Sequence, residues 1–124
     1  MSKKTSSVHY NEYLGLDKIL NAQKPLSSGD NNEAHEEMLF IIIHQTYELW
    51  FKQIIHEIES VMLMLGEEKI DEENVGLVVG RFDRVNKILD VLAQQLDILE
   101  TMTALDFLDF RNYLSPASGF QSHQ

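Results

Sequence analysis

Apolar residues recur every three to four positions along most of the chain, which is the spacing of one face of an α-helix. The pattern is longest over about residues 33–65, where Gly66 is the expected helix stop. Asp30 or Asn32 can cap this helix, and the glutamates of its first turns suit the positive end of the helix dipole. Its core-facing stripe is predicted to consist of Phe40, His44, Tyr47, Phe51, Ile54, Ile58, Met62 and Leu65.

A second long helix is predicted from about Glu72 to Thr101, with Asp71 as its N-terminal cap. Gly76 and Gly80 each cost about 1 kcal/mol relative to alanine in a helix interior, which suggests a close backbone approach beside them. The stripe of this helix is predicted to consist of Val75, Val78, Phe82, Val85, Leu89, Leu92, Leu96 and Leu99.

Shorter helical segments flank the two long ones. Residues 10–20 have the pattern of a short amphipathic segment, and a loop rich in turn-forming residues follows them. A third helix is predicted from Thr103, with Asp106 at capping-box spacing, to about Leu114, since the nearby proline cannot continue it. Strand-like alternation of useful length is absent. The sequence therefore predicts an all-α protein with two long antiparallel helices and shorter helices.

The 124 residues suit one compact unit. Residues 1–9 are polar and are expected to form a disordered tail, so the folded part is assigned to residues 10–124. The longest apolar run, residues 38–43, is far too short to span a membrane, and no signal peptide is recognisable.

Composition excludes several classes of function. The formal net charge is −10 and the basic residues are scattered, which argues against nucleic acid or an anionic membrane as a partner. The chain has no cysteine, so disulfides, zinc–thiolate sites and cysteine nucleophiles are excluded, and a reducing cytoplasmic location is compatible. Zinc-protease motifs, phosphate-binding glycine loops and the paired Glu-x-x-His motifs of di-iron bundles are also missing from the sequence.

Two polar residues on helix faces are candidates for ligand binding. His44 follows Phe40 by one turn; most buried histidines are structural, but a neutral imidazole in an apolar pocket can also direct one hydrogen bond to a ligand. Arg111 follows Phe107 by one turn; a surface ion pair with a nearby aspartate is the commoner arrangement, whereas a guanidinium facing a pocket clamps a carboxylate. A ligand with an aromatic body, an N–H group and a carboxylate would satisfy both.

Long strings of residues resemble the tryptophan 2,3-dioxygenase family. Residues 35–53 contain HEEMLFIIIHQ and YELWFKQ, and residues 99–122 contain LETMTALDF, DFR and LSPASGFQS. Residues 10–14 also resemble the amino-terminal element of that family. The resemblance implies a mostly helical subunit of a cytoplasmic homotetramer that binds haem b. It also implies that O2 opens the indole ring of L-tryptophan to give N-formylkynurenine.

The resemblance implies roles for the two candidate residues and their aromatic neighbours. His44 corresponds to the distal, catalytic histidine that hydrogen-bonds the indole N–H, and Phe40 to a residue that packs against both the indole and the haem. Arg111 corresponds to the partner of the substrate carboxylate, and Phe107 lines the same pocket.

Two further groups of site residues follow from the resemblance alone. Ser118 and Gly119 correspond to a turn near the haem and the substrate. Tyr10, Tyr13 and Leu14 correspond to residues that reach into the pocket of a neighbouring subunit, which would make the site depend on assembly.

Length is the main departure from the family. The family's subunit is more than twice as long, and its proximal haem ligand is a histidine in the carboxy-terminal part, which none of His9, His35, His56 or His123 matches. The chain is therefore expected to be a fragment, a truncated form or one piece of a split protein, which holds no iron ligand and binds haem weakly or not at all by itself.

Two other functions remain open from the sequence. One is a non-enzymatic helical module that self-associates to cover its apolar stripes. The other is a related haem enzyme that acts on another indole or aromatic substrate.

Overall fold

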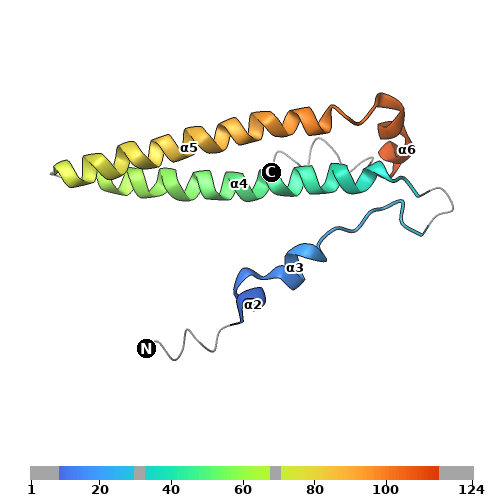
Figure 1. The fold of residues 1–124 in the computed structure, drawn as a ribbon, viewed down its shortest axis with the longest axis horizontal. Helices are drawn as coiled ribbons and strands as arrows, with labels where there is room; N and C mark the ends of the chain where they lie inside the picture. The colour runs from blue at the N-terminus through green and yellow to red at the C-terminus, as the bar shows by residue number, and fades with distance from the viewer. Residues whose placement is uncertain (1–8, 30–32, 68–70, 115–124) are drawn as a thin grey trace.

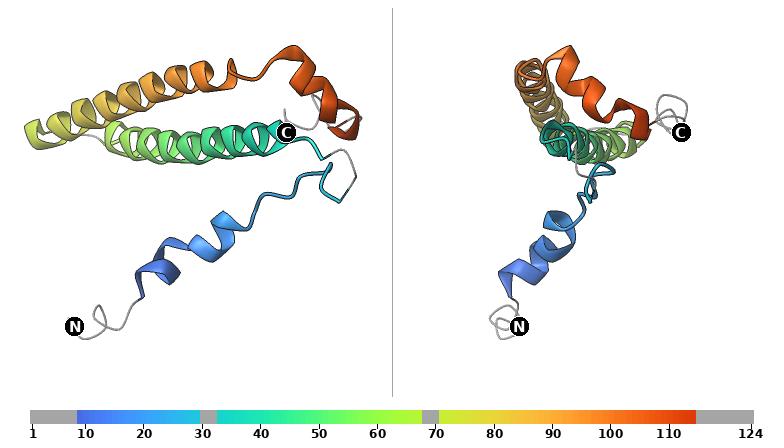
Figure 2. Two further views of the ribbon diagram at one scale, coloured as in Figure 1. Left: turned by 45° about the vertical axis from the view of Figure 1, so that its right-hand side comes forward. Right: turned by 90° about the vertical axis from the view of Figure 1, so that its right-hand side faces the viewer.

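The computed structural model describes residues 9–29, 33–67 and 71–114, and within them it contains five α-helices and no strand. They are α2 (Tyr10–Leu14), α3 (Leu16–Leu20), α4 (Glu36–Leu65), α5 (Glu72–Leu99) and α6 (Ala104–Leu114). The long helices α4 and α5 lie side by side and antiparallel, α6 crosses the end at which α4 begins, and α2 and α3 form an arm on the far side of α4 from α5 (Figures 1 and 2). The all-α prediction is confirmed.

Capping groups fix most helix ends where the sequence predicts them. The Asp71 carboxylate accepts a hydrogen bond of 2.8 Å from the backbone N–H of Asn74 and caps α5. Thr103 and Asp106 form the predicted capping box, in which each side chain accepts a hydrogen bond from the other's backbone N–H, at 3.0 and 3.1 Å. Gly66 follows the last residue of α4 as expected. The predicted end of α5 at Thr101 is two residues too late.

Two predictions near the amino terminus are wrong. Residues 10–20 are not one segment, because Gly15 adopts a left-handed backbone conformation (φ 64°) that ends α2 and begins α3. Helix α4 begins at Glu36, and His35 precedes it without a side-chain cap. The proposed caps Asp30 and Asn32 lie outside the described residues, as do residues 1–8 of the predicted disordered tail.

The faces of α4 and α5 that pack together differ from the predicted stripes. Phe51 and Met62 of the first stripe and Phe82 and Leu96 of the second are exposed. Helix α4 is apolar on more than one side, so its periodicity fits two neighbouring faces, and packing against α5 selects between them. The buried residues of the two helices are Glu37, Ile43, Glu57 and Val61 of α4 and Val85, Ile88 and Leu92 of α5.

Polar side chains cross-link the two long helices. The hydroxyl of Tyr47 donates a hydrogen bond of 2.7 Å to the Leu92 carbonyl, and the hydroxyl of Thr46 donates one of 2.9 Å to the Gln95 side-chain oxygen. These bonds join residues 45 and 49 positions apart in the sequence, so they fix the register of the antiparallel pair.

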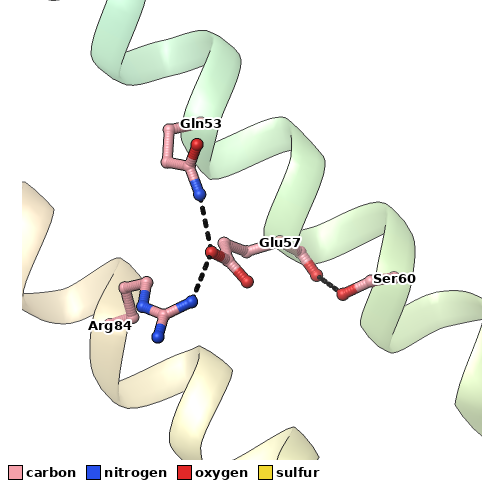
Figure 3. Close-up of polar contacts among 4 residues, drawn as sticks. All are labelled: Gln53, Glu57, Ser60 and Arg84. Carbon is pink, nitrogen blue, oxygen red and sulfur yellow. Dashed lines mark hydrogen bonds and ion pairs between the residues drawn. The ribbon is translucent and has the colours of Figure 1, made fainter. Parts of the chain in front are cut away.

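An ion pair lies further along the same interface (Figure 3). The buried carboxylate of Glu57 accepts hydrogen bonds from the Arg84 guanidinium, at 2.9 Å, and from the side-chain amide of Gln53, at 2.7 Å. The hydrogen bond from Arg84 lowers the pKa of Glu57, whereas burial raises it. The hydrogen bond from Gln53 also lowers it, and the resulting pKa lies below its ordinary value of 4.5.

Helix α6 docks on α4 through an aromatic side chain. Phe110 is fully buried, whereas Leu105 on the outer face of the same helix is 74% exposed. The Phe110 ring lies against Phe40 of α4, with 5.4 Å between ring centroids. No described helix is apolar over enough of its length to cross a membrane.

Replacing Phe110 tests this docking. Phe110→Ala should lower the free energy of unfolding by about 3–5 kcal/mol, because it removes a buried ring and leaves a cavity. Leu105→Ala, the matched control on the exposed face, should change it by less than about 0.5 kcal/mol. Urea denaturation followed by circular dichroism measures both. Equal effects of the two substitutions would contradict the docking role of Phe110.

The Glu57–Arg84 pair predicts a pH-dependent stability. Because the folded-state pKa of Glu57 is below 4.5, its contribution is fully present above that value and is lost as the pH falls through the folded-state pKa. The stability gap between the wild type and Glu57→Gln should therefore be larger at about pH 7 than at about pH 3. Denaturation midpoints at both pH values measure the gap. Glu59→Gln, on an exposed side chain, is the control, and a gap independent of pH would refute the prediction.

Candidate functional site

Three phenylalanines from α4 and α6 form a cluster at the end of the long helix pair. The ring centroid of Phe40 lies 5.9 Å from that of Phe107 and 5.4 Å from that of Phe110, and Phe107 and Phe110 are 5.3 Å apart. Phe40 and Phe107, the two aromatic residues predicted from sequence, are therefore in contact across 67 positions of the chain. They are half-buried, so part of each ring remains available.

Sequence reasoning missed the core role of Phe110. The signal was present, because Phe107, Phe110 and Leu114 are spaced by three and four positions on α6, as residues of one face should be. The buried ring is what holds the two helices carrying Phe40 and Phe107 together.

His44 lies one turn beyond Phe40 but is not buried, which corrects its expected place on a core-facing stripe. Its side chain is 57% exposed, and its Nε2 atom lies 3.5 Å from a carboxylate oxygen of Glu48. His44 borders two shallow hollows. One opens between α4 and α5 beside Tyr47, Phe51 and Leu96, and the other opens toward the arm beside Ile19, Ala22 and Leu49. The imidazole is thus accessible from both sides of α4.

Arg111 lies one turn beyond Phe107 on α6, and its side chain is exposed. The commoner alternative, an ion pair with Asp106 or Asp109, is not observed: Asp106 serves the capping box, and Arg111 forms no ion pair with any residue that the structure describes. Its guanidinium is therefore unpaired within the part of the chain that the structure describes. Neither of the two hollows beside His44 is lined by a residue of α6.

The predicted site residues of α2 lie away from the aromatic cluster. Tyr10 and Tyr13 project from α2 at the far end of the arm, more than 70% exposed, with ring centroids 6.3 Å apart. Leu14 is more than one-third exposed, and α2 has no buried residue. Ser118 and Gly119 lie outside the described residues.

The chemistry of the cluster fits one face of a flat, apolar group such as haem. The half-buried rings of Phe40 and Phe107 offer aromatic carbon for such a face to stack against. Within residues 9–29, 33–67 and 71–114, no group of three or more His, Cys, Asp or Glu side chains gathers as metal ligands would.

Comparison with known proteins agrees with the resemblance seen in the sequence. The family model described as tryptophan 2,3-dioxygenase matches residues 1–124. A tryptophan 2,3-dioxygenase from Bdellovibrio bacteriovorus is 54% identical over 117 residues, which cover 94% of this chain and 33% of the relative. The chain thus spans about a third of the length of that relative. With a match over its whole length, the chain belongs to the tryptophan 2,3-dioxygenase family.

Proposed function

We propose that the protein containing this chain is a haem-dependent oxidoreductase that inserts both atoms of O2 into L-tryptophan and opens its indole ring to N-formylkynurenine. This reaction begins tryptophan breakdown by the kynurenine pathway. In this proposal the chain supplies the distal, substrate-binding side of the pocket, and haem b takes its iron ligand from residues outside this chain. Family membership supports the class of reaction.

One observation supports the division of roles among residues. Phe40 and Phe107 are in contact, and the next turn of each helix carries a polar group suited to one part of tryptophan. The imidazole of His44 would accept a hydrogen bond from the indole N–H, and the free guanidinium of Arg111 would pair with the carboxylate through two parallel hydrogen bonds. The indole ring would lie against the half-buried phenylalanines.

These residues would bind and orient the substrate. Haem, when bound, supplies the iron chemistry by which O2 reacts. Clamping the carboxylate at one end and the N–H at the other fixes the indole ring relative to the reacting oxygen, which lowers the entropic part of the barrier. His44 need not remove a proton for this purpose, since one directed hydrogen bond is enough to select the ring orientation.

The arm supports a role for a neighbouring subunit. Tyr10 and Tyr13 are highly exposed aromatic residues that lie next to each other on a helix with no buried residue. We propose that they and Leu14 enter the pocket of an adjacent subunit in a cytoplasmic homotetramer, as the family resemblance implies.

Self-association without catalysis is a second candidate for the chain on its own. Apolar side chains along α4 and α5 are exposed, with Met62 at 66% and Val79 at 62%. Apolar surface of this extent favours association, so the isolated chain would form a haem-free oligomer. Sedimentation together with an absorption spectrum separates this outcome from haem binding.

The carboxylate clamp predicts a selective loss of affinity. Arg111→Ala should weaken binding of L-tryptophan to the haem-loaded protein by about tenfold to hundredfold, since a charge-assisted pair is lost. Binding of tryptamine, which lacks the carboxylate, should change little. Calorimetric titration with both compounds measures the difference. An unchanged affinity for tryptophan, or an equal loss for both ligands, would rule out the clamp.

The distal role of His44 predicts a loss of ligand orientation without a loss of haem. His44→Ala should keep the Soret absorption and reduce kcat/KM for tryptophan by about threefold to tenfold. The substitution should matter less for 1-methyltryptophan, which has no indole N–H. His56→Ala, another exposed histidine of α4, is the control. Loss of haem in His44→Ala would show that this residue has a different role.

A further inference from the structure

A buried carboxylate on the first turn of α4 ties the arm to that helix. Glu37 is 1% exposed and accepts hydrogen bonds from the backbone N–H groups of Leu26, at 2.7 Å, and Ser27, at 2.9 Å. It also accepts one from the Ser27 hydroxyl, at 2.5 Å. The same hydroxyl accepts a hydrogen bond of 3.1 Å from the N–H of Ala34. Ser27, itself fully buried, thus links residues before α4 to the helix.

The chemistry of this contact requires a carboxylate. Glu37 has no lysine, arginine or histidine within ion-pair distance among the described residues, so neutral donors alone compensate its burial. Burial raises the pKa of Glu37, but the hydrogen bonds from Ser27 and Leu26 together outweigh it, and the pKa lies below its ordinary value. An amide of the same shape would place an NH2 group against one of these donors.

A second contact holds the arm two turns further along α4. The side-chain amide of Gln45 donates a hydrogen bond of 3.1 Å to the Ala22 carbonyl, and its oxygen accepts one of 2.9 Å from the amide of Gln23. The Gln23 amide also donates to the carbonyl of Ile19, at 2.8 Å, within the last turn of α3. Both contacts therefore lie on the segment between the arm's helices and α4.

Hydrogen bonds rather than apolar packing fix the arm. Helices α2 and α3 contain no buried residue, and neither packs against α4. Helices α2 and α3 project away from the helix pair (Figures 1 and 2). The direction of the arm therefore depends on the two contacts made by residues 22–27.

The residues of α4 that make these contacts, Glu37 and Gln45, lie on either side of Phe40 in the sequence. Gln45 is the neighbour of His44 in sequence, and Ile19 of the arm and Ala22, which follows the arm, line a hollow together with His44. Releasing residues 22–27 would remove this wall of the hollow and free the arm to change direction.

We propose that Glu37 and Gln45 are positioning residues that hold residues 22–27 along α4 and so fix both the direction of the arm and the wall of the hollow beside His44. The effect on tryptophan turnover rests on the proposed function, whereas the fixing of the arm does not.

Hydrogen–deuterium exchange tests the fixing of the arm in the purified protein. Glu37→Gln should increase the exchange rate of the Leu26 and Ser27 amides by about tenfold or more, because the side-chain amide places an NH2 group against one of these donors and so weakens the whole contact. Ser27→Ala should have a smaller effect, since both backbone donors remain. The matched control is Glu36→Gln. Glu36 is the neighbouring residue, and its side chain makes no hydrogen bond with the described residues.

The same experiment contains the outcome that would overturn the proposal. Peptides from the α4–α5 interface should exchange as in the wild type, because the contact is confined to the arm. Unchanged exchange of residues 22–29 in Glu37→Gln refutes the proposal, and so does an equal increase throughout α4 and α5, which would show general unfolding.

Steady-state kinetics of the haem-loaded protein tests the link to the site. Glu37→Gln and Gln45→Leu should raise KM for tryptophan by about threefold to tenfold, with haem content unchanged and a smaller change in kcat. A merely structural role would lower the amount of active enzyme and leave KM unaltered. If the wild type does not oxidise tryptophan, the proposed function fails, while the exchange measurement still decides whether these residues fix the arm. An unchanged KM in a variant with a released arm refutes the link to His44.

Discussion

The packing of Phe110 against Phe40 is the contact on which the arrangement of the site depends. Helix α6 is short, and its only described helix partner is α4, so a single buried ring supplies much of the apolar contact. The capping box of Thr103 and Asp106 turns the chain after α5 and directs α6 back across α4. Without both features, the turn that carries Arg111 would have no fixed position relative to α4.

The secondary structure could be predicted from sequence because its causes are local. Hydrophobic periodicity identified the long helices, and the side chains of Asp71 and Thr103 marked helix starts. The contact faces could not be predicted in the same way. Helix α4 has apolar residues on several sides, and the buried face includes Glu57, which a search for apolar positions passes over. The position of Arg84 on α5, together with the Gln53 amide, explains why that carboxylate lies inside.

The candidate site shows the same difference between features with local causes and features that depend on packing. Family resemblance pointed to Phe40 and Phe107, and their contact in space agrees with a common pocket, but periodicity alone could not bring two distant helices together. The sequence pattern also could not distinguish Glu37 from Glu36, since both are acidic residues suited to the start of a helix. The difference arises from a loop ten residues earlier in the chain, whose donors happen to reach one of the two carboxylates.

The two buried carboxylates of α4 illustrate two solutions to one physical problem. Glu57 is compensated by a cation on α5, and Glu37 by neutral donors from the preceding segment. A buried charge adds little net stability, but a wrong alignment would leave it without partners, and that costs much more. A shifted register of α4 against α5 would therefore leave Glu57 without its partner and destabilise the helix pair. A displaced arm would do the same to Glu37. Each carboxylate acts chiefly by making one arrangement of its neighbours far better than the alternatives.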